Sequence, residues 1–217
     1  MNYYQVVFFS ASVFIATIIG WVRFRKTEPN CFPFLLCLTL ASVNEIISFI
    51  LTQAGLHTII NNNVYVLLEA VLIIWQFKNW GLFGKYNALF LFLLVSIILT
   101  WLIDSFLVSN TNSLNLYFRI IYAFIIVLMS IHINNILILT YRKRLLQSSV
   151  FLICSGFIIY FTYKILVETF WLYGLDKSRH FRINVYLLLT WINLIVNLIY
   201  ALAMLWIPKK PQFIRLS

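Results

Sequence analysis

Residues 61–77 read NNNVYVLLEAVLIIWQF, an apolar run with an ionisable carboxyl, Glu69, near its middle. Apolar runs of this kind are typical of helices that cross a bilayer, because about 20 apolar residues span roughly 30 Å of hydrocarbon. A carboxyl in such a helix is costly unless it faces the interior of a helical bundle and finds partners there. The stretch therefore predicts a membrane-spanning helix and a polar site inside a bundle.

The composition of the whole chain agrees with this interpretation. Its 217 residues are 63% hydrophobic and 10% charged, whereas soluble domains contain about 25% charged residues. We expect an all-α, polytopic membrane bundle that forms a single transmembrane domain over residues 1–217. The first span has no basic region before it and no small-residue cleavage site, so we expect a retained helix and not a signal peptide. The seven predicted spans are 4–22, 32–53, 62–80, 87–108, 116–140, 150–174 and 183–207.

Cations gather at alternate span ends, and this bias predicts the orientation. Short cytoplasmic loops are enriched in lysine and arginine, so we expect the N-terminus outside and the C-terminus in the cytoplasm. Topology and attraction to anionic lipid headgroups account for the net charge of +10, and we expect no nucleic-acid partner. The cations at the predicted cytoplasmic ends are Arg23, Arg25, Lys26, Lys78, Lys85, Arg142, Lys143, Arg144, Lys209, Lys210 and Arg215.

The two halves of the chain share three short features at a shift of about 120 residues. These features predict parallel repeats over 1–81 and 116–207, related by an axis along the membrane normal, with a linker helix at 87–108. The alternative is coincidence in a chain rich in leucine, isoleucine and asparagine. The matching features are Asn63-Val64-Tyr65 with Asn184-Val185-Tyr186, Gly55-Leu56 with Gly174-Leu175, and Arg23-x-Arg25 with Arg142-x-Arg144.

This layout of three, one and three spans is similar in topology to SWEET and PQ-loop transporters, and the number of spans resembles that of opsin-like receptors. The motifs of those families do not match. No Pro-Gln dipeptide lies inside a predicted span, and the four prolines lie outside the spans or at their edges. The last span has no lysine for a retinal Schiff base, so no functional residue is carried over from either family.

Four of the six acidic residues, Glu45, Glu69, Asp104 and Glu168, lie inside predicted spans, and helical phase places Glu69 and Glu168 on polar or aromatic stripes. One stripe joins Asn62, Tyr65, Glu69 and Gln76, a second joins Tyr160, Lys164, Glu168 and Trp171, and a third joins Tyr186, Asn193, Asn197 and Tyr200. We expect a cluster in the outer half of the bundle that lines a solute or ion pathway. The alternative is that these groups only hold helices together. The candidate residues are Glu45, Glu69, Lys164, Glu168, Asn44, Tyr65, Asn193, Asn197, Arg119 and Asp104.

Three classes of function remain open. The favoured class is a transporter or channel for a small solute or cation. The second is a membrane sensor, regulator or accessory subunit of a multi-gene system such as phage defence, acting through a cytoplasmic partner or as a homo-oligomer. The third is an intramembrane enzyme on a lipid-like substrate, but no catalytic residue is assigned. Scattered histidines and unpaired cysteines predict neither a metal site nor a cofactor. We expect a multi-pass protein of a bacterial plasma (inner) membrane.

Overall fold

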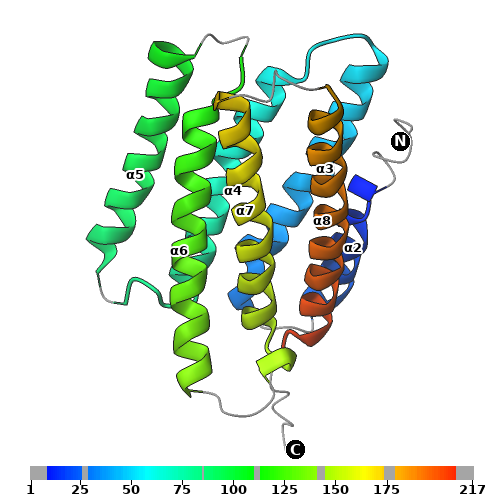
Figure 1. The fold of residues 1–217 in the computed structure, drawn as a ribbon. Coiled ribbons are helices and arrows are strands. Elements are labelled where there is room, and N and C mark those ends of the chain that lie inside the picture. Colours follow the sequence, from blue (N-terminus) through cyan, green and yellow to red (C-terminus); the bar gives the residue numbers. More distant parts are fainter. Residues whose placement is uncertain are drawn as a thin grey trace, which may run out of the picture.

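The computed structural model describes residues 9–25, 29–84, 86–109, 113–140, 145–173 and 179–208. Within these ranges the chain is helical, with no strand, and the long helices run alternately up and down (Figure 1). Three short segments accompany them: η1 (Pro29–Cys31), the π-helical turn η2 (Asp104–Val108) and η3 (Leu145–Gln147). The long elements are α2 (Val13–Phe24), α3 (Phe32–Gln53), α4 (Ile59–Asn79), α5 (Asn87–Ile103), α6 (Leu116–Thr140), α7 (Ser149–Tyr173) and α8 (Arg179–Trp206).

Six of these helices are long and apolar enough to cross a membrane, namely α3 to α8. The prediction of an all-helical, multi-pass membrane protein is confirmed at this level. Helix α2 has 12 residues, about 18 Å of helix, which is shorter than a hydrocarbon core of roughly 30 Å. The first predicted span begins in residues outside the described ranges, so the seventh crossing stays a prediction.

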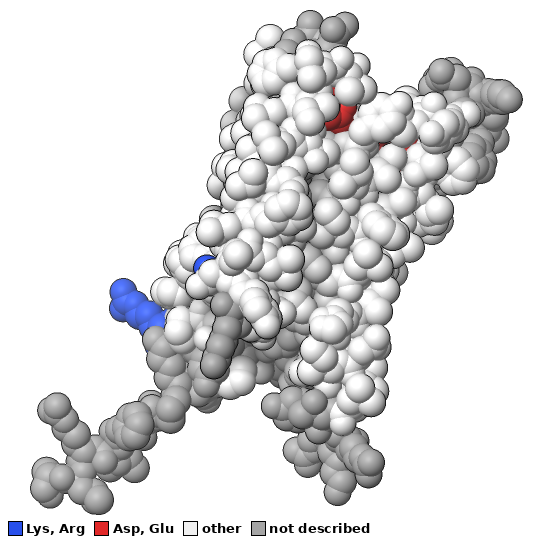
Figure 2. Space-filling view, turned by 90° about the vertical axis from the view of Figure 1, so that its left-hand side faces the viewer, with Lys and Arg blue, Asp and Glu red and all other residues white. Residues whose placement is uncertain are grey.

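The outer surface of the bundle is apolar. Large hydrophobic side chains point outward along its length, including Phe92, which is 70% exposed, and Leu139, which is 82% exposed. Among the described residues, the face carrying α5 shows almost no charged side chain (Figure 2). Such a surface is suited to lipid contact, because a water-soluble protein rarely exposes apolar patches of this extent.

Six helices form a closed ring, and α5 lies outside it. Helix α2 packs against α3 and α8, α3 packs against α4, α4 contacts α6, α6 packs against α7, and α7 packs against α8. Helix α5 contacts α4 and α6 from the outside, at the edge of the bundle (Figure 1). The ring encloses a central space that α5 does not reach.

The basic end of the bundle, defined by Arg23, Arg25 and Lys78, is closed by polar contacts to the backbone. Arg23 Nη1 donates to the Met204 carbonyl at 2.6 Å. Gln76, on α4, accepts a hydrogen bond from the Phe34 amide at 2.8 Å and donates one to the Asn30 carbonyl at 2.8 Å. These bonds supply partners for the first turn of α3, where amide groups have no acceptor within the helix. Gln76 therefore serves helix packing.

Several residues used in the predictions of orientation and repeat lie outside the described ranges. The cations in this group are Lys26, Lys85, Arg142, Lys143, Arg144, Lys209, Lys210 and Arg215, and the repeat positions are Gly174 and Leu175; the side chain of Tyr186 is also undescribed.

Candidate functional site: a polar cavity inside the ring

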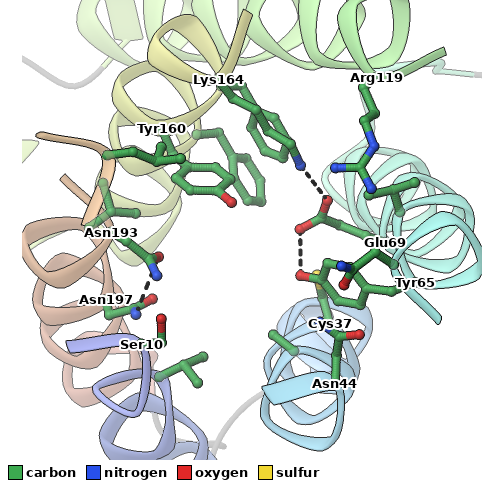
Figure 3. Close-up of a pocket in the computed structure, with 18 of the residues that line it drawn as sticks. Ser10, Cys37, Asn44, Tyr65, Glu69, Arg119, Tyr160, Lys164, Asn193 and Asn197 are labelled. Atoms are coloured by element: carbon green, nitrogen blue, oxygen red, sulfur yellow. Dashed lines mark hydrogen bonds and ion pairs between the residues drawn. The ribbon is translucent and has the colours of Figure 1, made fainter. Parts of the chain in front are cut away.

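A cavity of about 330 Å³ lies inside the ring, and all six ring helices contribute to its lining (Figure 3). The structure brings nine of the ten candidate residues together there, although they come from five different helices. Asp104 is the candidate that does not line it. The nine are Asn44 and Glu45 from α3, Tyr65 and Glu69 from α4, Arg119 from α6, Lys164 and Glu168 from α7, and Asn193 and Asn197 from α8.

Glu69 is the centre of a hydrogen-bonded group on one wall. Its carboxylate is 5% exposed and accepts hydrogen bonds from the Tyr65 hydroxyl at 2.8 Å and from the Tyr122 hydroxyl at 2.8 Å. The Lys164 ammonium lies 3.4 Å from the carboxylate oxygen that Tyr122 also contacts. Glu69 therefore has three donors from three helices. This arrangement compensates a charge that would otherwise be costly to bury.

Lys164 is held from several sides. Besides Glu69, its ammonium contacts the Tyr122 hydroxyl, and it lies 5.1 Å from the centre of the Tyr122 ring and 5.5 Å from that of Tyr160. Ammonium groups at such distances from aromatic rings are attracted by the ring electrons. Spacing alone allows Lys164 to pair with Glu168 one turn away on the same helix, but Lys164 bonds to α4 and Glu168 bonds to α6. Both ion pairs thus link different helices.

The second ion pair joins Arg119 and Glu168. Arg119 Nη1 lies 3.3 Å from Glu168 Oε1, and both side chains are about nine-tenths buried. The Nε and Nη2 atoms of Arg119 are buried and have no hydrogen-bond partner among the described residues. Buried guanidinium donors are normally satisfied, so the N–H groups of these two nitrogens need a partner that the described part of the chain does not provide.

The opposite wall carries neutral amides and a hydroxyl. Asn197 donates to Ser12 Oγ at 2.8 Å and lies 3.5 Å from the Asn193 side-chain oxygen. Figure 3 shows both asparagines with Ser10 across the cavity from Glu69. Asn44, on the Glu69 side, accepts a hydrogen bond from Asn61 at 2.7 Å. The cavity therefore has one charged wall and one wall of neutral hydrogen-bonding groups.

Aromatic side chains close the cavity toward the basic end. The Phe34 ring centre lies 5.6 Å from that of Phe157 and 5.0 Å from that of Tyr200, and Phe77 packs behind them. A methyl group at Gly156 would overlap the Tyr200 ring, so glycine lets α7 and α8 approach closely at this level. We call Phe34, Phe77, Phe157 and Tyr200 the aromatic floor. A separate cavity of about 190 Å³, near Trp80 and Trp206, lies at the basic end.

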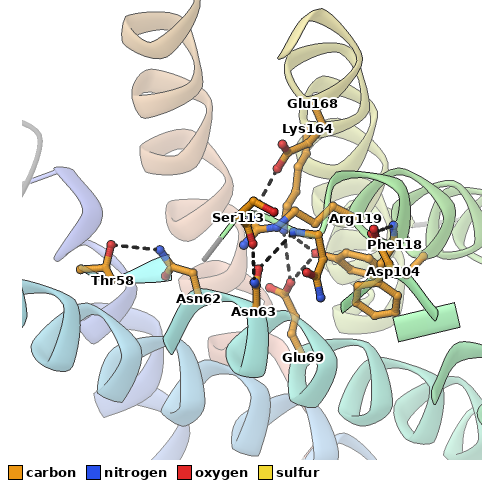
Figure 4. Close-up of polar contacts among 12 residues, drawn as sticks. Thr58, Asn62, Asn63, Glu69, Asp104, Ser113, Phe118, Arg119, Lys164 and Glu168 are labelled. Carbon is orange, nitrogen blue, oxygen red and sulfur yellow. Dashed lines mark hydrogen bonds and ion pairs between the residues drawn. The ribbon is translucent and has the colours of Figure 1, made fainter. Parts of the chain in front are cut away.

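Asp104 belongs to a different polar group. Its carboxylate accepts the Phe118 amide at 2.7 Å and the Ser109 hydroxyl at 2.8 Å, so it caps the start of α6 (Figure 4). Nearby, Asn115 donates to Ser105 Oγ at 2.6 Å. These contacts fasten the end of α5 to α6. Asp104 therefore has the contacts of a helix cap and not those of a cavity residue.

Comparison with known proteins identifies no relative of this chain. No family model, curated protein or solved structure matches the chain. Among the described residues, no group of three or more histidine, cysteine, aspartate or glutamate side chains is placed to hold a metal ion. Function is therefore inferred from the cavity itself, because a helical bundle alone does not specify an activity.

The site predicted from the sequence does not include Tyr122, which lies at the centre of the hydrogen-bonded group in the structure. Tyr122 contacts both Glu69 and Lys164 and is fully buried. It follows Arg119 by three positions, which places both side chains on one face of α6. A search of that face for hydroxyl groups would have included Tyr122 in the cluster. The stripes predicted from the sequence lie on the spans 62–80, 150–174 and 183–207, and no stripe is predicted on 116–140, which carries Tyr122.

Proposed function

We propose that this chain binds a small polar solute or ion in the central cavity and passes it across the membrane. The observation that carries the proposal is the cavity of about 330 Å³ with five acidic or basic side chains in its lining, Glu45, Glu69, Arg119, Lys164 and Glu168. Charged groups inside a membrane bundle are expensive and usually mark a pathway or binding site. Small-molecule sites in proteins have volumes of roughly 300–1,000 Å³, so the cavity is large enough for a small solute.

The order of helices in the ring supports the proposal of parallel repeats. An exchange of α2–α4 with α6–α8 maps each contact onto another: α2–α3 onto α6–α7, α3–α4 onto α7–α8, and α4–α6 onto α8–α2. The cavity lies between the two sets, where repeat-built transporters hold substrate. Asn63 is buried whereas Asn184 is exposed, so the shared motif makes different contacts in each half. A best superposition about an axis in the membrane plane would contradict parallel repeats.

The orientation we propose keeps the basic end in the cytoplasm, supported by Arg23, Arg25 and Lys78 at that end. The solute then enters from outside and meets the aromatic floor, which must open for passage. Single cysteines at His57, between α3 and α4, and at Gln147, in η3, test this orientation in cells. A membrane-impermeant thiol reagent should label the cysteine at His57 from outside and the one at Gln147 only after permeabilisation. Labelling of both from outside would contradict it.

The decisive test of a pathway is access to the cavity from both sides. Asn197→Cys is introduced after Cys31, Cys37 and Cys154 are replaced by alanine, and the protein is reconstituted in vesicles of known orientation. We expect an impermeant methanethiosulfonate to react from either side, because the floor opens during transport. Leu91→Cys, which is exposed on the lipid side of α5, is the control and should react from neither side.

The second candidate is a membrane sensor, and the closed aromatic floor favours it. A receptor needs an opening on one side only, and Phe34, Phe157 and Tyr200 pack against one another on the side of the basic end. Reaction of Asn197→Cys from outside alone, with no solute flux into the vesicles, would reject the pathway and support the sensor.

A further inference from the structure

The charges of the five acidic and basic side chains that line the cavity do not cancel. Three carboxylates face two cations, so the ionised set has a net charge of −1. Glu69 pairs with Lys164 and Glu168 pairs with Arg119. Glu45 is left over: it is partly buried and makes no hydrogen bond or ion pair with the described residues. A ligand with a positive group would compensate this carboxylate.

Arg119 has two nitrogens without a partner among the described residues, whereas Lys164 already uses two of its three donors. The Lys164 ammonium already contacts Glu69, the Tyr122 hydroxyl and three aromatic rings. Arg119 is 9% exposed and lines the cavity, and its Nε and Nη2 atoms are buried without a partner among the described residues, so a ligand meets these atoms only after the guanidinium turns toward the cavity. A guanidinium group presents donors in a planar fork that matches the two oxygens of a carboxylate. The unused donors therefore call for an anionic group on the ligand.

A ligand with a single charge can pair with Glu45 or with Arg119, but not with both. A simple anion would use Arg119 but raise the negative charge of the cavity from one to two. A simple cation would compensate Glu45 and leave the Arg119 donors unpaired. A molecule that carries both a carboxylate and an ammonium meets both requirements without changing the net charge. The neutral wall, with Asn193 and Asn197, supplies further hydrogen-bonding groups for the charged ends of such a ligand.

We propose that the cavity binds a zwitterionic amino acid, with its carboxylate on Arg119 and its ammonium facing Glu45. The inference deepens the proposed function by naming the class of solute. It depends on Arg119, Glu45 and access to the cavity from one side, and it does not depend on passage through the aromatic floor.

The test is calorimetric titration of the full chain in lipid nanodiscs. Glycine, γ-aminobutyrate and ε-aminocaproate are the zwitterionic probes, which differ in the distance between their charges. Butyrate and butylamine are matched to γ-aminobutyrate and lack one charge each. We expect at least one zwitterion to bind about tenfold or more tightly than butyrate and butylamine, because two charge-assisted contacts replace one. No binding by any zwitterion, or equal affinity for a singly charged probe, overturns the proposal.

Two substitutions assign the two ends of the ligand. Arg119→Lys keeps the positive charge beside Glu168 but removes the fork, so we expect affinity for the best zwitterion to fall about tenfold. Glu45→Gln should weaken the zwitterion and butylamine alike and leave butyrate unaffected. Arg25→Gln, which removes an exposed charge at the basic end, is the control and should bind as the parent does. Unchanged zwitterion affinity in folded Arg119→Lys overturns the assignment.

The two proposals fail separately. If Asn197→Cys reacts from outside alone and vesicles show no flux, while zwitterions still bind, the pathway is rejected and the ligand class stands. If the cysteine reacts from both sides but no zwitterion binds, the pathway stands and the ligand class is rejected.

Discussion

Glu69 and Asp104 are both carboxylates buried inside this bundle, and the fold uses them in opposite ways. Asp104 is 1% exposed and accepts hydrogen bonds from a backbone amide and a hydroxyl close to it in the chain. Glu69 is 5% exposed and takes its donors from Tyr65, Tyr122 and Lys164, on three helices around a cavity.

The sequence separation of their partners distinguishes Asp104, which stabilises local structure, from Glu69, which belongs to the cavity. The partners of Asp104 lie 5 and 14 residues away in sequence, and one of them is an amide at the start of a helix. Lys164 lies 95 residues from Glu69. Asp104 supplies hydrogen-bond acceptors to groups near it in the chain. The Glu69–Lys164 ion pair joins two distant helices and lines the cavity, so a ligand in the cavity can contact it. Substitutions should therefore separate stability from binding at the two places.

The largest expected effect is at Lys164. Lys164→Met leaves the Glu69 carboxylate buried without its cation and should lower the free energy of unfolding by about 3–5 kcal/mol. Chemical unfolding in detergent micelles measures the change. The double variant Lys164→Met with Glu69→Gln should recover a large part of the loss, because the unpaired charge is gone. A Lys164→Met protein as stable as the parent would mean that Glu69 does not depend on this pair.

Asp104→Ala should be the next largest change in stability. It leaves the Phe118 amide and the Ser109 hydroxyl without an acceptor and should cost about 2–3 kcal/mol. Zwitterion affinity should stay at the parent value in the folded protein, because Asp104 does not line the cavity. Ser109→Ala, which removes one of the two contacts, should cost about 1 kcal/mol. Weaker binding in Asp104→Ala, measured by titration, would argue against two separate polar groups.

The smallest stability effect is expected on the neutral wall. Asn197→Ala removes hydrogen bonds to Ser12 and Asn193 and should cost about 0.6 kcal/mol, the average for such bonds inside membranes. Zwitterion affinity should fall severalfold, because Asn197 faces the cavity. Asn134→Ala is the matched control: Asn134 is buried and bonds to Ser155 at 3.4 Å, away from the lining. Equal binding by both variants would remove the neutral wall from the site.

Much of the site could be read from the sequence. The apolar spans follow from composition, and the stripe on 150–174 that carries Tyr160, Lys164, Glu168 and Trp171 follows from helical phase, since residues three or four apart share a face. All four line the cavity. Helical phase does not predict the role of a polar side chain that bonds to the backbone of another helix. Gln76 shares a face with Glu69, but it accepts a hydrogen bond from an amide at the start of α3.

The amino-acid sequence by itself determined that this is a helical, multi-pass membrane protein with acidic residues inside its bundle, because hydropathy and helical periodicity are local properties of the chain. Only the tertiary structure decided the partners of those acids. Glu69 pairs with Lys164 on α7, Glu168 pairs with Arg119 on α6, and Asp104 caps α6 outside the cavity. The physical reason is that helical phase gives the direction of a side chain from its own axis, whereas a contact also needs the neighbouring helix, its rotation and its height. Those are set by the packing of the whole ring.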